Sequence, residues 1–461
     1  MLTTQLDIFS VPVDDKFLIY APLHNLAALV DRKAARHIRA GLQSGSDPVP
    51  AAVQPIVEQL RSPGAPAPAP RTGPLDDPFF LGLIPTRGCN LGCCYCDFAA
   101  PKQSSPVMDL SLACQALDAY FDLLRGSGRR RAEVHFFGGE PFYAETVVHL
   151  AVEYAALRAR ELGMAVRFEA TTNGVYSAAR CHWIADHFDT IVLSLDGPAE
   201  IQDRQRPALD GRSTFAVVAR NAKILSGGSV ELILRVCVTN ETVTRMPEIA
   251  RWMGREFCPS TVCFETLTAT PRSRGAGLTP PVPWEFARNF SAAARILGDY
   301  GIETVLSTAD LRTSRVNFCP VGRDALIVSP DGAVEACYLL QEDWERRGLN
   351  MRLGRLDGHG LQIDPEALWR VRRLTVLEKP LCANCLCRYH CAGGCHVNHN
   401  MALPVGQFDA VCIQTRLVTI TQLLNQLGQH RLVDEWLADR AMWEASAWQR
   451  TDRLCGEEMR V

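Results

Sequence analysis

The chain has 461 residues, a formal net charge of -3 and 47% hydrophobic residues. This length exceeds one compact core, so we expect two or three domains, and the slightly acidic balance excludes a strongly basic nucleic-acid footprint. No apolar run approaches the ~18 residues of a membrane span, and the first seven residues lack the basic and apolar regions of a signal peptide. We therefore expect a cytoplasmic protein without a membrane partner, whose 18 cysteines serve as metal ligands or reduced thiols.

The first unit, residues 1–62, reads as a small α+β unit. Two apolar runs, 17–21 and 26–30, flank a Pro-Leu-His-Asn turn and predict two strands. Two helices are expected to follow, near residues 32–43 and 50–61. Residues 63–76 are rich in Pro and Ala without an apolar period, which indicates a semi-rigid linker.

Residues 77–308 alternate strand-like and helical segments. The expected strands are 79–85, 132–137, 165–171, 190–195, 231–238 and 261–267, with amphipathic helices such as 111–125 and 144–162 between them. Alternation of this kind predicts an α/β fold with a parallel sheet and crossover helices. Six βα units are fewer than the eight of a closed barrel, so we expect a partial (β/α)6 barrel.

Residues 309–415 are loop-rich and crowded with cysteine, so metal clusters are expected to organise this region more than a large apolar core does. The last segment, residues 416–461, has helical periodicity and is expected to pack as structural helices.

A compact cysteine motif, Cys89-x3-Cys93-x-Tyr95-Cys96, follows the strand expected at 79–85. Three close thiolates can hold three irons of a cubane cluster and leave the fourth iron open to a ligand. Zinc binding or ordinary buried thiols are the alternatives, although a structural zinc site normally draws four ligands as two separated pairs. A loop that follows a barrel strand lies at the carboxyl-end face, where active sites gather.

The motif resembles that of the radical S-adenosylmethionine (SAM) superfamily. The resemblance implies a 4Fe-4S cluster on Cys89, Cys93 and Cys96 whose open iron binds SAM, with Tyr95 among the SAM-binding residues. It also implies reductive cleavage of SAM to a 5'-deoxyadenosyl radical, with electrons from a flavodoxin- or ferredoxin-type donor.

Three later strand ends carry further motifs that resemble SAM contacts of the superfamily. Simple turn chemistry is the alternative for each of them taken alone. The residues that the resemblance assigns to SAM binding are Gly138, Gly139, Glu140, Pro141, Thr172, Asn173, Ser194, Asp196 and Arg235. Ser194 and Arg235 would hold the SAM carboxylate through charge-assisted hydrogen bonds. Gln202 stands where the superfamily usually has His, which leaves the roles of Asp203 and Arg206 open.

A second array of seven cysteines with Gly332 resembles the SPASM domain, which carries two auxiliary 4Fe-4S clusters. The resemblance implies that an inner cluster is held by Cys319, Cys337 and Cys395, and an outer cluster by Cys382, Cys385, Cys391 and Cys412. Zinc is the alternative, because Cys382-x2-Cys385 resembles half of a zinc ribbon. The fourth ligand of the inner cluster is unassigned: an open iron, Asp324, Cys387 and a substrate thiolate are the options.

Together these features predict three 4Fe-4S clusters, SAM as cofactor, and a radical SAM oxidoreductase that matures a peptide. The substrate expected from the SPASM resemblance is a ribosomally made precursor peptide or a protein, modified by a thioether, C-C or C-O crosslink. The N-terminal unit weakly resembles a leader-recognition domain, which captures a peptide strand at a sheet edge. A scaffolding role for this unit is equally compatible with the sequence.

Three other functions are kept open. They are oxidation of a protein side chain as in sulfatase maturases, chemistry on a small molecule, and a multi-cluster electron carrier or zinc protein without turnover. Sulfatase maturases carry an Asp base after the cysteine equivalent to Cys337, whereas this chain has Tyr338. Glu265 and Tyr338 are the positional candidates for a catalytic base.

Overall fold

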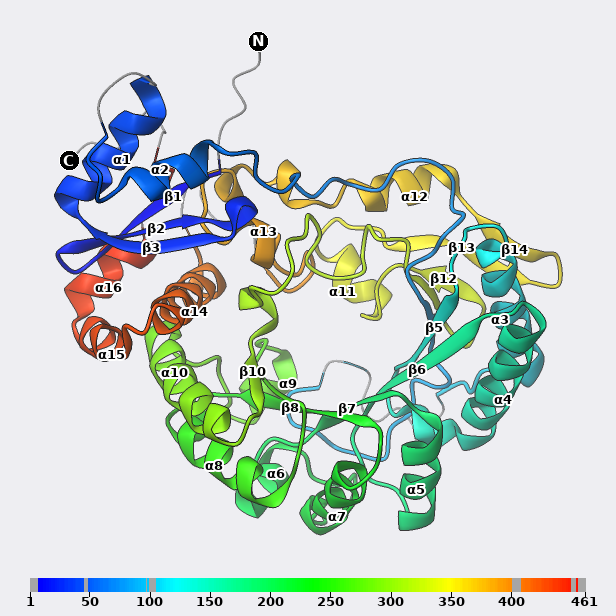
Figure 1. Ribbon diagram of the computed structural model, residues 1–461. Coiled ribbons are helices and arrows are strands. Elements are labelled where there is room, and N and C mark those ends of the chain that lie inside the picture. Colours follow the sequence, from blue (N-terminus) through cyan, green and yellow to red (C-terminus); the bar gives the residue numbers. More distant parts are fainter. Residues whose placement is uncertain are drawn as a thin grey trace.

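The computed structural model describes residues 7–44, 49–96, 98, 105–399, 408–448, 453 and 454, so the expectation that Cys455 is a buried thiol lies outside it. The main body is an 11-stranded sheet of order β10-β9-β8-β7-β6-β5-β4-β11-β12-β13-β14. The sheet curves strongly, with helices on its outer side and its concave side facing the segment that carries α11 to α13 (Figure 1). The α/β fold is as predicted, and no pairing of β10 with β14 closes the sheet in the described residues.

All six strands that the sequence predicts are present and parallel. They are β4 (Leu81–Leu83), β5 (Arg131–Phe136), β6 (Ala165–Thr172), β7 (Thr190–Ser194), β8 (Glu231–Val238) and β9 (Thr261–Thr266). A seventh strand, β10 (Glu303–Val305), extends the sheet beside β9. Its three residues are too few to give a readable alternation.

Helices cover the outer face because every second strand residue is apolar on that side. In β5, Ala132, Val134 and Phe136 are buried in the same core as the helices, whereas Glu133 and His135 lie on the concave side. The helices are α3 (Leu110–Leu124), α4 (Glu145–Glu161), α5 (Ala178–His187), α6 (Ala199–Gln205), α7 (Phe215–Ser226), α8 (Met246–Glu256), α9 (Pro271–Gly275) and α10 (Pro283–Asp299).

The cysteine-rich region continues the same sheet. Strand β11 (Leu326–Val328) pairs in parallel with β4, and β12 (Ala333–Glu335), β13 (Arg352–Asp357) and β14 (Gly360–Ile363) follow antiparallel. Short helices fill the rest of the region: α11 (Gln341–Glu345), α12 (Pro365–Arg372) and α13 (Arg388–Cys391). The cysteine loops are therefore attached to strands that extend the barrel sheet.

The N-terminal unit is a three-stranded antiparallel sheet with two helices. Strands β2 (Lys16–Ala21) and β3 (Leu26–Asp31) are the two that the sequence predicts, and β1 (Phe9–Val13) is added to β2. Helices α1 (Arg32–Ser44) and α2 (Gln54–Arg61) agree with the expected helices. Pro12 lies within β1, an outer strand of this sheet, where a residue without a backbone donor is tolerated.

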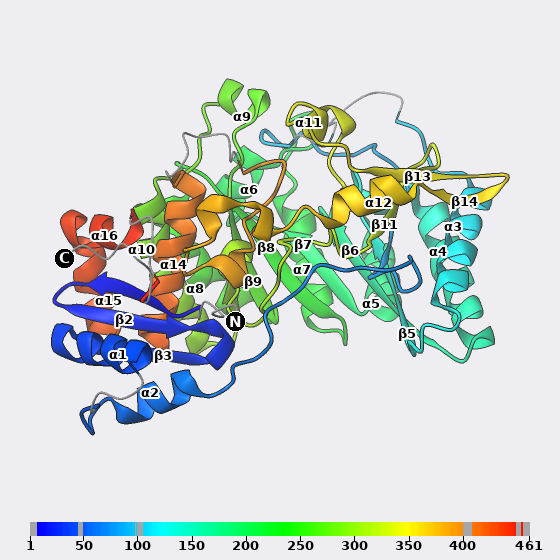
Figure 2. The same cartoon turned by 90° about the horizontal axis from the view of Figure 1, so that it is seen from above.

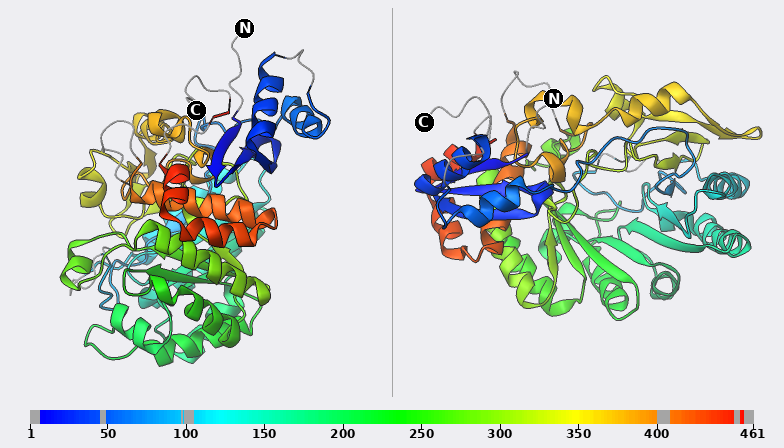
Figure 3. Two further views of the ribbon diagram at one scale, coloured as in Figure 1. Left: turned by 90° about the vertical axis from the view of Figure 1, so that its left-hand side faces the viewer. Right: turned by 45° about the horizontal axis from the view of Figure 1, so that its top comes forward.

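Three C-terminal helices join the N-terminal unit to the barrel: α14 (Ala410–Gln426), α15 (His430–Ala438) and α16 (Arg440–Ala447). They pack beside the sheet of the unit, as both views of Figure 3 show. The N-terminal unit lies on the side of the barrel away from α6 and α9, which follow the carboxyl ends of β7 and β9 (Figure 2). None of the described helices combines the length and the apolar character needed to cross a membrane.

Candidate active site and cysteine centres

The first cysteine loop runs from the end of β4 and is clamped on two sides by backbone hydrogen bonds. From the turn after β5, the amide of Gly139 donates to the carbonyl oxygen of Thr86 at 3.1 Å, and the amide of Glu140 donates to that of Gly88 at 2.9 Å. On the other side, the amide of Cys94 donates to the carbonyl oxygen of Gln205 at 3.0 Å. The loop is thus positioned by two segments that are remote in sequence.

Cys89, Cys93 and Cys96 lie together at the inner side of this loop. Burial raises the pKa of the Cys93 thiol to about 12, and neighbouring Cys96 and Cys89 also raise it. Burial likewise raises the pKa of Cys89 to about 11. Three such thiols can all be deprotonated only beside a strong positive charge, so the trio fits a metal cluster.

The glycine turn after β5 packs directly against the backbone of the cysteine loop. A Cβ atom on Gly139 would lie 2.2 Å from the carbonyl oxygen of Gly88, and one on Gly138 would lie 2.4 Å from that of Thr86. Gly138 also has a φ of 143°. These contacts account for both glycines, which the sequence alone assigned to close approach of a ligand.

Glu140 is buried and joins the glycine turn to the end of β6. Its carboxylate accepts hydrogen bonds from the amide of Asn173 at 2.7 Å, from Oγ1 of Thr172 at 2.9 Å and from the amide of Phe142 at 3.2 Å. Burial raises the pKa of Glu140 to about 7 despite these donors. In this structure the residue links two strand ends, and Pro141 opens the short helix that follows it.

Asn173 lies directly beside the cysteine trio. Its Nδ2 atom donates to Sγ of Cys89 at 3.5 Å and to Oδ1 of Asn90 at 2.8 Å. An amide that donates to a ligand sulfur stabilises the thiolate and tunes the potential of a bound cluster. Asn173 therefore contacts the loop as well as the region where the sequence places SAM.

Tyr95 and Asp196 bind each other behind the loop. The Tyr95 hydroxyl donates to Oδ2 of Asp196 at 2.7 Å, and Nη1 of Arg206 donates to the Tyr95 oxygen at 2.6 Å. Cys93 raises the pKa of Arg206, against the opposing effect of burial. Arg206, whose role the sequence left open, is thus a cation that interacts with Cys93 of the trio.

Gln202 and Asp203 have structural roles. Oε1 of Gln202 accepts a hydrogen bond from the amide of Asp196 at 2.9 Å. Oδ1 of Asp203 accepts from the amide of Thr214 at 2.8 Å, just before α7 begins. Gln202 thus binds the backbone of Asp196 through its oxygen, whereas its buried Nε2 atom has no hydrogen-bond partner among the described residues.

Ser194 and Arg235 are direct neighbours across β7 and β8 on the concave side. Arg235 is exposed to solvent there, and Ser194 is partly exposed. Burial by surrounding protein tends to lower the pKa of Arg235, but the Glu265 carboxylate and Cys263 outweigh it and raise the pKa. The structure therefore brings the two residues together, with a free guanidinium surface available to an anion.

The two candidate bases lie far apart. Glu265 on β9 accepts hydrogen bonds from the amide of Ser307 at 3.1 Å, from the Ser307 hydroxyl and from Cys263 Sγ at 3.2 Å. Tyr338 packs against the ring of Phe137, 4.6 Å between centroids, and its hydroxyl has no hydrogen-bond partner among the described residues. Four strands separate β9 from β4, against which Tyr338 lies.

The second cysteine array forms two groups. Burial raises the pKa of Cys319 to about 11, with Cys395 next in effect, and Cys337 has Cys319 and Cys395 as neighbours. Cys382, Cys385, Cys391 and Cys412 form the other group: besides burial, Cys385 raises the pKa of Cys382 and of Cys391, and all three raise the pKa of Cys412. The structure thus brings the members of each proposed ligand set close together; that they bind clusters stays a prediction.

Two options for the fourth inner ligand are not in position. Asp324 is buried and holds Arg372, whose Nε donates to Oδ1 at 2.8 Å, and it also pairs with Arg71 at 3.2 Å. Cys387 lies with the outer group, because its thiol contacts Cys385 and donates to Oγ1 of Thr419 at 3.5 Å. Of the four options for the inner cluster's fourth ligand position, an open iron and a substrate thiolate remain.

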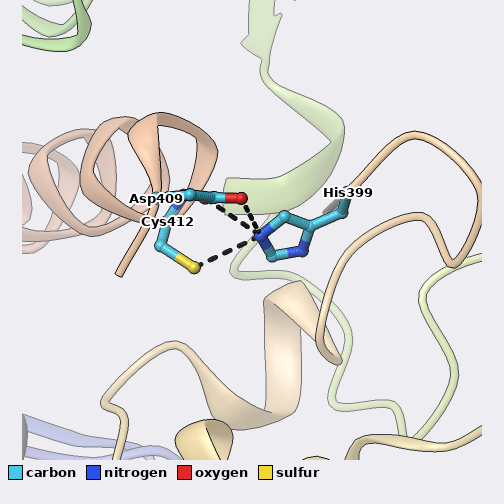
Figure 4. A group of neighbouring side chains, drawn as sticks. All are labelled: His399, Asp409 and Cys412. Carbon is cyan, nitrogen blue, oxygen red and sulfur yellow. Dashed lines mark hydrogen bonds and ion pairs between the residues drawn. The ribbon is translucent and has the colours of Figure 1, made fainter. Parts of the chain in front are cut away.

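Sequence reasoning missed two residues around the array. His399 lies between Asp409 and Cys412: its Nε2 atom is 2.9 Å from a carboxylate oxygen of Asp409 and 3.3 Å from Sγ of Cys412 (Figure 4). Lys379 is buried with Cys382 and Cys391 of one group and Cys395 of the other as neighbours. The sequence could have indicated His399, because a histidine lies inside a cysteine loop there. No sequence pattern indicated Lys379.

Comparison with known proteins agrees with this architecture. Residues 83–253 match the radical SAM superfamily. The chain is 27% identical over 351 residues to the serine-type anaerobic sulfatase-maturating enzyme of Klebsiella aerogenes, which covers 70% of this chain and 81% of the relative. It is 22% identical over 209 residues, 44% of the chain and 56% of the relative, to the cysteine-type enzyme of Clostridium perfringens (strain 13 / Type A).

Solved structures show the same fold. Native anSMEcpe with bound AdoMet and Cp18Cys peptide superposes with a TM-score of 0.57 and 16% identity, covering 76% of this chain and 98% of that chain. Streptococcus suis SuiB bound to S-adenosylmethionine gives a TM-score of 0.51 and 13% identity, covering 85% and 95%. The protein is an enzyme of the radical SAM class, and it is similar to anaerobic sulfatase-maturating enzymes. This class implies SAM and a 4Fe-4S cluster as cofactors.

Proposed function

We propose that this enzyme modifies side chains of a ribosomally made peptide or of a protein, and that the product is an intramolecular crosslink. The observation that carries the proposal is the arrangement of cysteines. Three lie in the loop after β4, and two further groups lie in the region that continues the same sheet.

The residues fit three 4Fe-4S clusters. In this proposal, Cys89, Cys93 and Cys96 hold the cluster that binds SAM. Ser194 and Arg235 receive the SAM carboxylate, because the exposed guanidinium lies beside a serine on the next strand. When bound, the cluster and SAM supply a carbon radical able to remove a hydrogen atom from an unactivated side chain. The two auxiliary clusters lie on the groups already described.

The concave side of the sheet is the proposed substrate chamber. Tyr338 and Phe137 make one wall apolar, and Glu265 and Arg235 make the other wall polar. With Asp324 and Cys387 engaged elsewhere, the inner cysteine group can accept a substrate thiolate as its fourth ligand. A thiolate bound there would favour a thioether among the candidate crosslinks.

The N-terminal unit supports a peptide as substrate. In the part of the chain that the structure describes, β3 pairs with β2 alone, so its other edge is open to a further strand. An open edge can bind an extended peptide by main-chain hydrogen bonds. We assign leader binding to this edge.

A second candidate function is oxidation of a serine or cysteine in a protein, as in sulfatase maturation. The 27% identity to the Klebsiella aerogenes enzyme over most of both chains favours it. Against it stands Tyr338, whose apolar surroundings raise its pKa far above the ordinary range. A phenol held in this way is a poor proton acceptor.

The first experiment tests the class of function. Anaerobically reconstituted protein should contain iron and sulfide for three 4Fe-4S clusters and produce 5'-deoxyadenosine from SAM with a flavodoxin or dithionite as donor. Stoichiometric zinc without SAM cleavage would instead identify a structural or electron-carrying protein.

The second experiment tests the substrate. The protein is co-expressed with the peptide encoded by a short reading frame beside its gene, and the peptide is analysed by mass spectrometry. A loss of two hydrogens without reactivity towards a hydrazide reagent indicates a crosslink. Hydrazide reactivity would indicate an aldehyde, and therefore the maturase-like oxidation. An unchanged peptide would contradict both and direct attention to small molecules.

A further inference from the structure

A small hollow, open to the surface, lies where the N-terminal unit meets the cysteine-rich region. One side is formed by the tip of the β2–β3 hairpin, with Pro22 and Asn25. The other side is formed by the loop after β10, with Thr313 and Ser314, and by His390 of α13. Because the hollow is open on one side, an extended chain can lie across it with one face against these residues.

The lining is polar and has no Asp, Glu, Lys or Arg side chain. Asn25, Thr313 and Ser314 are exposed and offer an amide and two hydroxyl groups, which can bond to peptide backbone. His390 is 3% exposed; its Nε2 atom lies 2.9 Å from Oγ1 of Thr419, whereas its buried Nδ1 atom has no partner in the described residues. A buried polar atom without a partner costs about 1–3 kcal/mol, so a hydrogen-bonding ligand would stabilise it.

The hollow continues the open edge of the N-terminal sheet. Asn25 directly precedes the first residue of β3, so a strand laid along the free edge of β3 reaches the hollow at one of its ends. The opposite edge of this sheet is already engaged: Phe9 of β1 forms an antiparallel bridge with Arg453, and the amide of Leu454 donates to the carbonyl oxygen of Ile8 at 2.8 Å. Among the strands that the structure describes in this unit, β3 is therefore the one with an edge that can guide a peptide here.

The same loop leads from the hollow to the proposed chamber. Arg312 pairs with Glu303 at the amino end of β10, at 2.5 Å. Arg315 donates to the carbonyl oxygen of Ser307, and Ser307 in turn binds Glu265 on the concave side. Because the N-terminal unit lies away from α6 and α9 (Figure 2), a peptide that comes from it enters the chamber opposite the first cysteine loop.

The position of the hollow is fixed by a buried ion cluster. Asp7, just before β1, pairs with Arg388 of α13 at 3.3 Å and accepts a hydrogen bond from the Tyr389 hydroxyl. Asp7 also pairs with Arg453 at 2.6 Å. The two sides of the hollow are thus joined directly, so their spacing is a built property of the fold.

We propose that this hollow binds the extended, uncharged segment that connects the leader of the peptide to the residues that are modified. The proposal rests on the peptide function given above. It makes Asn25, Thr313, Ser314 and His390 determinants of which linker sequences are accepted: small and hydroxylated residues fit, and a charged side chain would lose its water without gaining a partner.

The test uses the full-length enzyme and the precursor peptide encoded beside its gene. Thr313→Trp fills the hollow, and Thr279→Trp, at another exposed loop threonine, is the matched control. We expect Thr313→Trp to reduce crosslinked product at least about tenfold, equivalent to about 1.4 kcal/mol. Binding of the isolated leader, measured by fluorescence anisotropy, and SAM cleavage without peptide should equal those of the control. Full product formation by Thr313→Trp would overturn the inference.

Photo-crosslinking gives a second, independent readout. With p-benzoylphenylalanine at position 313, irradiation should attach the peptide through residues between the leader and the modified site. Attachment elsewhere, or none, would overturn the inference while the wild-type enzyme still makes product. Failure of the wild-type enzyme to modify the peptide would contradict the proposed function itself.

Discussion

Cys93 and Cys94 are adjacent in sequence and have opposite surroundings. Cys93 is 6% exposed and lies with Cys89 and Cys96, whereas the thiol of Cys94 donates to the carbonyl oxygen of Gln205 at 3.2 Å. We expect Cys93→Ala to abolish 5'-deoxyadenosine production, because it removes a ligand of the proposed SAM-binding cluster. Cys94→Ala should retain most of the activity. Chromatography of the 5'-deoxyadenosine that each variant produces tests this prediction. Activity of Cys93→Ala at the wild-type level would refute the assignment of Cys93 as a cluster ligand.

His399 is a positioning residue for Cys412. Asp409 and the carbonyl oxygen of Gly393, 3.0 Å from Nδ1, hold its ring, so that Nε2 faces the cysteine sulfur. Hydrogen bonds to a ligand sulfur raise the potential of an iron–sulfur cluster. His399→Leu should therefore lower the midpoint potential of one auxiliary cluster by on the order of tens of millivolts.

Redox titration followed by electron paramagnetic resonance measures this potential in reconstituted protein. His396→Leu is the control, since the groups that shift the pKa of His396 are Lys379, the backbone of Leu374 and His399, and Cys412 is not among them. An unchanged potential in His399→Leu, with full iron content, would show that the histidine only packs.

Single residues differed in how far the sequence could predict them. The two cysteine groups of the second array were predicted from the SPASM resemblance and not from spacing, because Cys337 and Cys395 of one group are 58 positions apart. The ion pair of Asp324 with Arg372 joins residues 48 positions apart. No local pattern reports such a contact, and so the sequence kept Asp324 as a possible ligand.

At the scale of elements, β5 and β6 hold two titratable groups face to face. His135 and Glu169 are partners in the register, with Nδ1 and Oε1 3.9 Å apart. Burial lowers the pKa of His135 to about 4 and raises the pKa of Glu169 to about 7. Between about pH 4.5 and 6.5 the folded pair carries one proton on Glu169, and the unfolded pair carries one on His135. The two contributions to the change of stability with pH therefore cancel in the wild type within this range.

A single variant at either position should reveal the pH dependence of stability that the remaining residue contributes. His135→Phe keeps the stacking on Phe80, 4.2 Å between centroids, and leaves only the raised Glu169 pKa. Its stability should fall as the pH rises from about 4.5 to about 7, because the folded state then loses its extra proton. Glu169→Gln should do the opposite, with stability that rises from about pH 4 to 6.5. Thermal unfolding across this range measures both; two parallel, flat profiles would contradict the assigned pKa directions.

The elements that alternation predicts are those long enough to show a period. Strands β5 to β9 and the helices after them show a period because each buries one face against a continuous core, whereas the three-residue β4 was predicted from the longer apolar run at 79–85. Strands β10 and β11 have three residues each, and they form by pairing with the strand beside them. The sheet therefore extends further than its sequence pattern predicts, and it carries the cysteine-rich region with it.

At the scale of the whole molecule, Asp7 joins three distant parts of the chain. Its carboxylate binds Arg388 beside the outer cysteine group, Arg453 near the carboxyl end, and Tyr389. Asp7→Ala removes the anion and leaves buried cations behind, an imbalance that typically costs about 3–5 kcal/mol. We expect the N-terminal unit to undock while the barrel keeps its fold.

Hydrogen–deuterium exchange should then show faster exchange in β1 and near α13 for Asp7→Ala, with SAM cleavage in the absence of peptide at the wild-type rate. Asp15→Ala, in the exposed turn between β1 and β2, is the control and should exchange like the wild type. Because undocking separates the β3 edge from the chamber, Asp7→Ala should also lose product formation more than it loses leader binding. Wild-type exchange and product yield in Asp7→Ala would show that the unit is held by apolar contacts with α16 instead.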